Sequence, residues 1–168
     1  MPSVNVALKI DDNGYANCAT AESRIEASLD RVWTVVTDVD NFAGRVPMIH
    51  RIRVDGKRAT VQLRFKMSLF SVGFEFVVDE HSEEKRWIEL RYVSGEPRGI
   101  RLRFDLEPLD DGEACLLRTT GEFDVMSLGW LAKYFLKHHP EIQCGVLPGV
   151  AIGLLEAMRR AAEGKPAH

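Results

Sequence analysis

The spacing of the apolar residues changes abruptly between residues 24 and 54, and this change limits the fold more than any other feature of the chain. Ile25 and Ala27 alternate with polar residues, which is the pattern of a half-buried strand. The apolar residues that follow are spaced as i, i+3, i+4 and i+7, which is one face of a helix. They are Leu29, Val32, Trp33 and Val36. The segment therefore predicts a strand that leads directly into a short helix.

Capping and breaking residues divide the helical part of this segment in two. Ser28 and Asp30 stand at the junction, where a side-chain oxygen can accept from free N–H groups and a negative charge suits the helix dipole. A second short helix starts within residues 38–42, and Pro47 forbids its continuation. Two short helices in this position commonly grip the side of a curved sheet instead of forming a parallel crossover.

Residues 48–125 alternate almost without interruption between apolar and polar side chains. One face of these strands is apolar and the other is charged, so we expect an antiparallel meander with one wet face. Turn residues at 95–99 and 110–112 separate the later strands. The length of the alternating region predicts a strongly curved sheet of six to seven strands.

Helical spacing returns near the C-terminus. A mainly aromatic helical stripe of Trp130, Leu131, Tyr134 and Phe135 is expected opposite Lys133 and Lys137 and is interrupted at residues 138–140. Val150, Leu154, Met158 and Ala161 then repeat along a long last helix. The glycines of that helix, Gly145, Gly149 and Gly153, indicate a close approach of the helix to the sheet or a bend.

The 168 residues predict one domain, 1–168, in which residues 1–18 add an N-terminal strand that folds back onto the next one. The net charge of −3 gives no basic excess, so no nucleic-acid partner is expected. The N-terminus has no apolar signal region, and the three scattered cysteines suit a reducing cytoplasm. We therefore expect a cytoplasmic protein.

The titratable residues form no recognised catalytic or metal-binding pattern. The five histidines and three cysteines lack the spacing of metal ligands, and the chain has no GxGxxG sequence, phosphate-binding loop or nucleophile elbow. We therefore expect no cofactor, no metal and free cysteines.

The element order resembles the helix-grip fold of the SRPBCC superfamily, which includes START domains, polyketide cyclase/dehydrase-like proteins and Bet v 1 allergens. The resemblance covers residues 19–164 and is carried by two segments. These are IEASLDRVWTVVTDVDNFAGRVP and PGVAIGLLEAMRRAAEG. It implies an α+β fold, with a curved antiparallel sheet, two short helices after the first strand, and a long C-terminal helix. It also implies a hydrophobic-ligand pocket between the sheet and that helix, but no shared catalytic signature.

Element widths favour such a pocket. A helix is about 10 Å wide, whereas each strand adds nearly 5 Å to a sheet, so one helix is narrower than the predicted sheet. We expect a cavity with a mainly apolar lining, although the same side chains could instead fill the core. The predicted lining residues are Phe65, Phe76, Tyr92, Leu102, Phe104, Thr119, Leu154 and Met158.

Three polar residues are predicted to share the apolar face. His50 alternates with Met48 and Ile52, and Tyr92 and Thr119 follow apolar residues in their strands. Each could bind a carbonyl or hydroxyl group of a ligand, or could equally satisfy a backbone group. His50 and Tyr92 together could support acid–base cyclisation, as in some aromatase/cyclases of this fold.

The most favoured function is binding or transport of a hydrophobic small molecule such as a lipid, a quinone or a polyketide-like aromatic. One alternative is a polyketide cyclase or dehydratase that uses the same cavity. Another is a protein-interaction module like the coenzyme-Q chaperone and ribosome-associated toxin group. We expect the Trp130 stripe to gate the pocket, with ordinary packing or transient membrane-surface contact as alternatives. The oligomeric state, monomer or homodimer, stays open.

Overall fold

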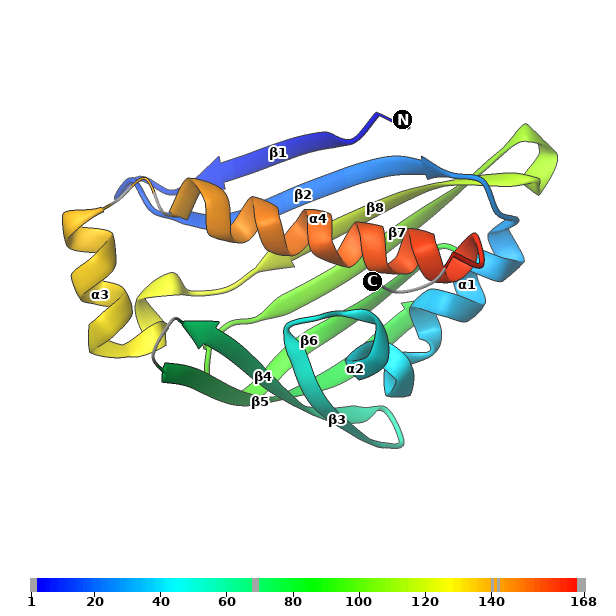
Figure 1. Cartoon of the computed structure of the whole chain (residues 1–168). Helices are drawn as coiled ribbons and strands as arrows, with labels where there is room; N and C mark the ends of the chain where they lie inside the picture. Colours follow the sequence, from blue (N-terminus) through cyan, green and yellow to red (C-terminus); the bar gives the residue numbers. More distant parts are fainter. Residues whose placement is uncertain (1–2, 68–69, 140, 142, 166–168) are drawn as a thin grey trace.

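An eight-stranded antiparallel sheet curves around one long helix (Figure 1). The computed structural model describes residues 3–67, 70–139, 141 and 143–165. The strands lie in the order β1-β2-β8-β7-β6-β5-β4-β3. Their bounds are β1 Asn5–Ile10, β2 Ala16–Ile25, β3 Ile49–Asp55, β4 Arg58–Met67, β5 Phe70–Glu83, β6 Trp87–Gly95, β7 Arg101–Leu109 and β8 Ala114–Glu122.

Four helices and three 3-10 turns complete the described elements. The helices are α1 Leu29–Thr37, α2 Phe42–Arg45, α3 Gly129–His138 and α4 Gln143–Ala162. The 3-10 turns are Val39–Asn41, Asp110–Gly112 and Val125–Leu128. Among the described residues, no helix is both long and apolar enough to cross a membrane.

The predicted strand-to-helix switch is where the chain crosses the sheet. β2 pairs with β8, whereas β3 lies at the far edge, so α1 and α2 carry the chain across one end of the sheet. The hydroxyl of Ser28 accepts a hydrogen bond from the Arg31 N–H group at 3.3 Å and caps α1 as expected. Val32 and Val36, from the predicted apolar stripe, are fully buried.

The sheet has eight strands, so the predicted count of six to seven was too low. Residues 48–125 supply six of them, and both strands of the N-terminal hairpin join the same sheet. β1 falls within the predicted extension 1–18 and pairs with β2 in antiparallel register, Val6 opposite Ala21. The periodicity of single strands could not show whether the hairpin would belong to this sheet or stand apart.

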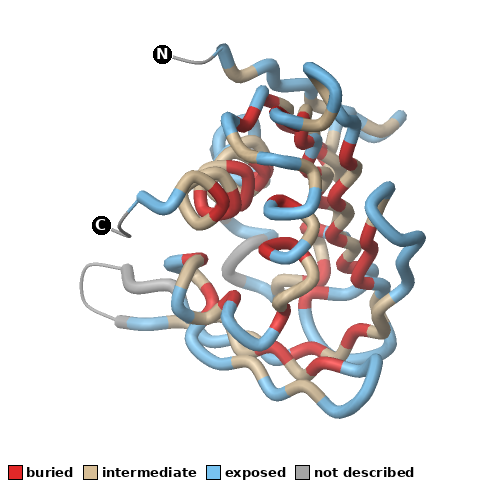
Figure 2. Tube along the Cα trace, turned by 90° about the vertical axis from the view of Figure 1, so that its right-hand side faces the viewer, coloured by how far each residue is buried: buried red, intermediate tan, exposed pale blue. Residues whose placement is uncertain are grey.

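We call the side of the sheet that faces α4 the inner face and the other side the outer face. Buried positions alternate with more exposed ones along the strands, and the buried turns of α4 face the sheet (Figure 2). α4 packs against β1, β2 and β8 in the sheet, and against α1 and α2 beside it. The helix therefore lies over one half of the inner face.

Gly95 marks an unusually close approach of two strands. It lies opposite Phe76 and has a φ of +97°, in the left-handed region that favours glycine. A Cβ atom at this position would lie 2.3 Å from the carbonyl oxygen of Glu75. The β5–β6 pairing at this point therefore depends on the absence of a side chain.

The glycines of α4 do not all have the predicted role. A Cβ atom at Gly145 or Gly149 would meet no atom within 4 Å, so neither glycine provides a close approach to the sheet. At Gly153 a Cβ atom would lie 4.0 Å from the terminal methyl of Met48, which is an ordinary packing distance. Two of the three glycines lie on exposed parts of the helix and serve no close packing, while the alternative role, a bend in the helix, stays a prediction.

Candidate functional site

The candidate site is the part of the inner face that lies towards α3. There, apolar side chains of several elements are only half-buried, whereas Val32 and Val36 of α1 are fully buried, although Leu29 and Trp33 of α1 are half-buried as well. They are Met48, Leu63, Phe74, Tyr92 and Val150. Leu63 lies opposite both Ile49 and Phe74, so β3, β4 and β5 are adjacent at this point. We call this the α3-side surface.

α4 is held over its half of the sheet by a buried hydroxyl. Thr119 is completely buried, and its Oγ1 donates to the carbonyl oxygen of Ala151 at 2.8 Å and, less closely, to that of Ala21 at 3.3 Å. The prediction that Thr119 contacts a ligand stays a prediction. Its hydroxyl proton is already used in the hydrogen bonds that hold α4 against β2 and β8.

Two apolar contacts set the distance between α4 and the curling sheet. A Cβ atom on Gly121 of β8 would touch Val150 at 3.8 Å and Leu102 at 4.0 Å, so the small residue lets α4 lie close to the strand. On the other side, Met48 reaches Gly153 of α4 from just before β3. The sheet therefore curls until the beginning of its far edge strand contacts the helix.

Five of the predicted lining residues lie in the hydrophobic core. They are Phe76, Leu102, Phe104, Leu154 and Met158. Phe104 packs edge-on against Phe42 of α2, with ring centroids 6.0 Å apart, at the end of the molecule away from α3. Whether any of these side chains borders a cavity stays a prediction.

His50 does not lie on the apolar face, so this part of the interpretation is wrong. The register of β3 against β4 shifts between Ile49 and Arg51, which makes His50 the extra residue of a bulge. Ile49 is buried and His50 is exposed. The strict alternation used for the prediction fails at a bulge, because one inserted residue reverses the faces of those before it.

Tyr92 is half-buried on the α3-side surface, and its hydroxyl donates to the carbonyl oxygen of Gly95 at 3.0 Å. Trp130 is exposed, and the side chain of Phe65 lies outside the described residues. The sequence prediction brought Tyr92 to this surface but missed four other residues, which are Met48, Leu63, Phe74 and Val150. Their alternation and helical spacing placed them on the inner face, but gave no sign that they would be less buried than their neighbours.

The outer face carries a network of charged side chains. Glu89 is 1% exposed, and its carboxylate contacts Arg91, Arg101 and Arg103. Burial alone would raise the pKa of Glu89, but hydrogen bonds from Arg91 and Arg103 outweigh this effect and the pKa lies below its ordinary value. This network stabilises strand pairing and leaves Glu89 ionised.

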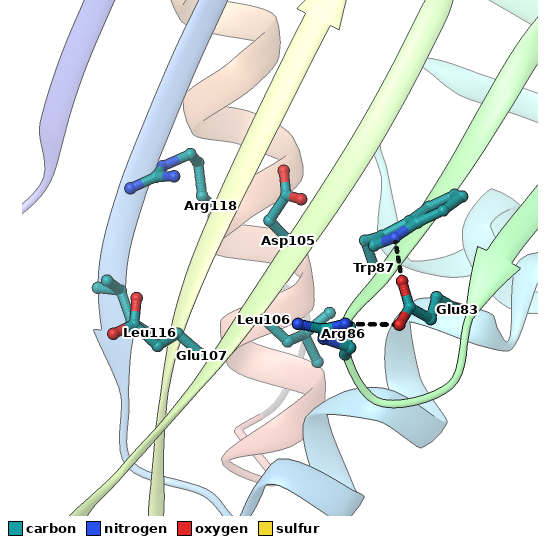
Figure 3. Close-up of a pocket in the computed structure, with 8 residues that line it drawn as sticks. All are labelled: Glu83, Arg86, Trp87, Asp105, Leu106, Glu107, Leu116 and Arg118. Atoms are coloured by element: carbon teal, nitrogen blue, oxygen red, sulfur yellow. Dashed lines mark hydrogen bonds and ion pairs between the residues drawn. The ribbon is translucent and has the colours of Figure 1, made fainter.

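A hollow of about 330 Å³ lies on the outer face, beside this network (Figure 3). Its two arginines are already paired, Arg86 with Glu83 at 2.6 Å and Arg118 with Glu22 at 2.8 Å. Hydrogen bonds from Arg86 and from Trp87 lower the pKa of Glu83. Because its cations are neutralised and it opens to solvent, this hollow is a weaker ligand site than the α3-side surface.

The cysteines and acidic groups offer no alternative centre. Cys18, Cys115 and Cys144 are all free thiols, and burial raises the pKa of Cys115 to about 11. Within the described ranges, no three His, Cys, Asp or Glu side chains form a group that could hold a metal ion.

Comparison with protein families gives one match, to a family described as polyketide cyclase / dehydrase and lipid transport, over residues 17–143. The match includes the short helices and the meander but ends at the first residue of α4. Among curated proteins, no sequence matches the chain.

Several solved structures share the fold. A conserved protein from Geobacillus kaustophilus is 12% identical with a TM-score of 0.69, covering 88% of this chain and 95% of its own. A START superfamily protein from Mycobacterium smegmatis is 15% identical with a TM-score of 0.63, over 88% and 95%. An aromatase/cyclase from a Streptomyces species is 17% identical with a TM-score of 0.54, over 98% and 100%. At these identities the likeness shows the fold alone.

Proposed function

Because the chain belongs to the polyketide cyclase/dehydrase and lipid-transport family, we propose that it binds a hydrophobic small molecule between α4 and the inner face of β4, β5 and β6. The ligand classes are those expected from the sequence: a lipid, a quinone or a polyketide-like aromatic. Small-molecule sites of this kind are mainly apolar with few polar groups.

The uneven cover of the inner face is the observation that supports this proposal. α4 packs over β1, β2 and β8, while Leu63 and Tyr92 on the other half are only half-buried. A hydrophobic ligand placed against them would remove apolar surface from water, at about 25 cal/mol for each Å² buried. The α3-side surface offers one polar anchor, the Tyr92 hydroxyl.

Native mass spectrometry of the freshly purified protein tests the proposal directly, through the mass of any co-purified small molecule. Displacement of a fluorescent fatty acid then gives affinities for variants. Leu63→Trp fills the α3-side surface and should weaken binding about tenfold or more, because overpacking excludes the ligand. Val54→Trp, at a half-buried position near the other end of β3, is the matched control and should bind normally. Equal affinities for both variants would place the ligand elsewhere.

A second candidate is catalysis, either cyclisation or dehydration, at the same surface. It is supported by the half-buried Tyr92 hydroxyl, which could transfer a proton to a bound polyketide-like substrate. The exposed His50 adds little to this candidate. Tyr92→Phe separates the two functions, because it should abolish turnover in an enzyme but leave the affinity of a binding protein within about threefold.

We further propose that the segment from the 3-10 turn Val125–Leu128 through α3 closes the entrance to this surface. It connects the end of β8 with the start of α4 and lies at the end of the molecule away from α1 (Figure 1). Hydrogen exchange with and without the fluorescent fatty acid tests the closure. Protection should rise between residues 125 and 139 on binding, and unchanged exchange there would contradict it.

A further inference from the structure

One face of α3 is exposed and combines aromatic rings with lysines. Trp130, Lys133, Tyr134 and Lys137 are spaced as i, i+3, i+4 and i+7, so they share one side of the helix. The expectation that the lysines lie opposite these aromatic residues is therefore wrong. Trp130 is 77% exposed and Tyr134 is 55% exposed. Both lysines are exposed as well. We call this set the α3 face.

Solvent exposure of a whole aromatic face is unusual for a helix in a folded domain. In most surface helices the aromatic residues turn towards the core and the charged residues turn away. Here Leu136 packs against the core, while Trp130 and Tyr134 lie on the exposed side. Exposed apolar patches on stable domains mark surfaces of interaction.

Other exposed apolar residues lie at the same end of the molecule. Ile10, the last residue of β1, and Val146, in the first turn of α4, are both exposed. The end of β1, the first turn of α4 and α3 lie on one side of the structure (Figure 1). Val6 and Val93 are also exposed, so this end holds four of the six large exposed apolar side chains in the described part of the chain.

Charge distinguishes the candidate partners of the α3 face. α3 contains no acidic residue, although the whole chain has a net charge of −3. A symmetric contact between two copies through this face would bring four lysines together without a carboxylate from α3. Negatively charged lipid headgroups would instead pair with the lysines, while aromatic rings enter the interfacial layer.

We propose that the α3 face docks the protein onto bilayers that contain anionic phospholipid. Trp130 and Tyr134 enter the headgroup region, and Lys133 and Lys137 contact the phosphates. An interfacial helix of this kind lies in the plane of the membrane and does not cross it. This docking does not depend on the proposed ligand, because the α3 face is on the surface of the protein.

Co-sedimentation with lipid vesicles tests the proposal on the full chain. The wild-type protein should bind vesicles with about a third anionic phosphatidylglycerol, and bind neutral phosphatidylcholine vesicles several-fold more weakly, because surface charge supplies part of the affinity. The double variant Lys133→Glu/Lys137→Glu should bind the anionic vesicles about tenfold or more weakly. Trp130→Ala should lose roughly tenfold on both kinds of vesicle, since the buried ring contributes apolar area.

The matched control is Arg53→Glu/Lys57→Glu, which makes the same change of charge at exposed positions of the β3–β4 hairpin. It should bind within about twofold of wild type if the contact is local, because screening confines surface charge effects to about 10 Å. Circular dichroism checks that each variant is folded.

Three results would overturn the proposal. If the wild-type protein does not sediment with anionic vesicles, the proposed membrane docking is wrong. Equal losses of vesicle binding in the α3 variant and the hairpin variant would show that only the net charge of the protein matters, and not the α3 face. A dimer in analytical ultracentrifugation that Trp130→Ala dissociates, together with absent vesicle binding, would assign the α3 face to contact between copies or to a protein partner.

Discussion

The two ends of the molecule contain similar apolar patterns but very different packing. At the α1 end, Val32, Val36 and Phe42 are fully buried between the sheet and α4. At the α3 end, Trp130 and Tyr134 are exposed on a helix with the same i, i+4 spacing of apolar residues. The difference indicates that the α1 end holds the fold together, while the α3 end leaves apolar side chains in contact with solvent.

Polar contacts follow the same division. At the α1 end, the guanidinium of Arg31 donates to the carbonyl oxygens of Ala161 and Ala162 at the end of α4. Glu163 accepts a hydrogen bond from the Glu26 N–H group at 3.1 Å. These contacts fix the C-terminal end of α4 against α1 and β2, whereas Gly145 and Gly149 near its start face open space.

The largest expected difference between the ends is in core stability. Phe42→Ala should lower the free energy of unfolding by about 3–5 kcal/mol, because it removes a buried ring that packs against Phe104. Trp130→Ala should change it by less than about 0.5 kcal/mol. Urea unfolding of both variants measures the contrast. Similar losses would mean that α3 belongs to the cooperative core and that the comparison fails.

The second-largest loss of stability is expected on the outer face near the α1 end. Glu89→Gln should lower the free energy of unfolding by about 2–3 kcal/mol at neutral pH, because three arginines lose their buried counter-charge. The folded pKa of Glu89 lies below its ordinary value of 4.5. Its contribution is therefore present above that pH and lost as pH falls through the folded pKa.

Unfolding at neutral and acidic pH measures this dependence. Wild type should lose more stability than Glu89→Gln between the two conditions, because the variant has no carboxylate to protonate. Parallel losses in both proteins would show that Glu89 is not stabilised by its arginines.

A smaller loss is expected at the end of α4. Arg31→Met keeps the length of the side chain but removes the donors to Ala161 and Ala162, and should cost about 1 kcal/mol. Hydrogen exchange should then rise in the last turn of α4 and stay unchanged at its start. If exchange rises at the start of α4 instead, Arg31 does not fix the C-terminal end of the helix.

The smallest expected effect is a gain in the free energy of unfolding. Gly149→Ala should raise the free energy of unfolding by about 0.5–1 kcal/mol, because the glycine is in a helix and a Cβ atom would meet nothing within 4 Å. Chemical unfolding measures the gain, with Gly153→Ala as a control at a position that faces Met48. A loss at position 149 would show that the start of α4 is packed more closely than the structure indicates.

The sequence was sufficient for the fold because each element carries its own local signal. The change of period at Ser28 and the turn residues between strands define the elements without long-range information. The resemblance then supplied their arrangement. Two features were beyond this reasoning: the bulge at His50, which reverses alternation without a marker residue, and the membership of β1 in the main sheet.

The candidate site was less predictable for a physical reason. Periodicity shows which face a residue occupies but not what lies over it, so Phe104 and Tyr92 looked equivalent although one is in the core and the other is half-buried. The same limit applies to α1 and α3, whose stripes differ in burial because only α1 is enclosed by α4. The burial of an inner-face residue depends on how much of the sheet the helices cover. The apolar pattern of a single strand carries no information about that coverage.

The close approach at Gly95 has a consequence for how this protein tolerates mutation. Gly95 is exposed, and surface positions usually accept most residues. Every other amino acid, however, would place its Cβ atom against the Glu75 carbonyl and the Phe76 backbone. In a library of all single substitutions, position 95 should therefore behave like a core position, while exposed Gly149 should accept many residues. Directed evolution of the α3-side surface would need to leave Gly95 unchanged, although it lies in the same strand as Tyr92 and accepts its hydroxyl hydrogen bond.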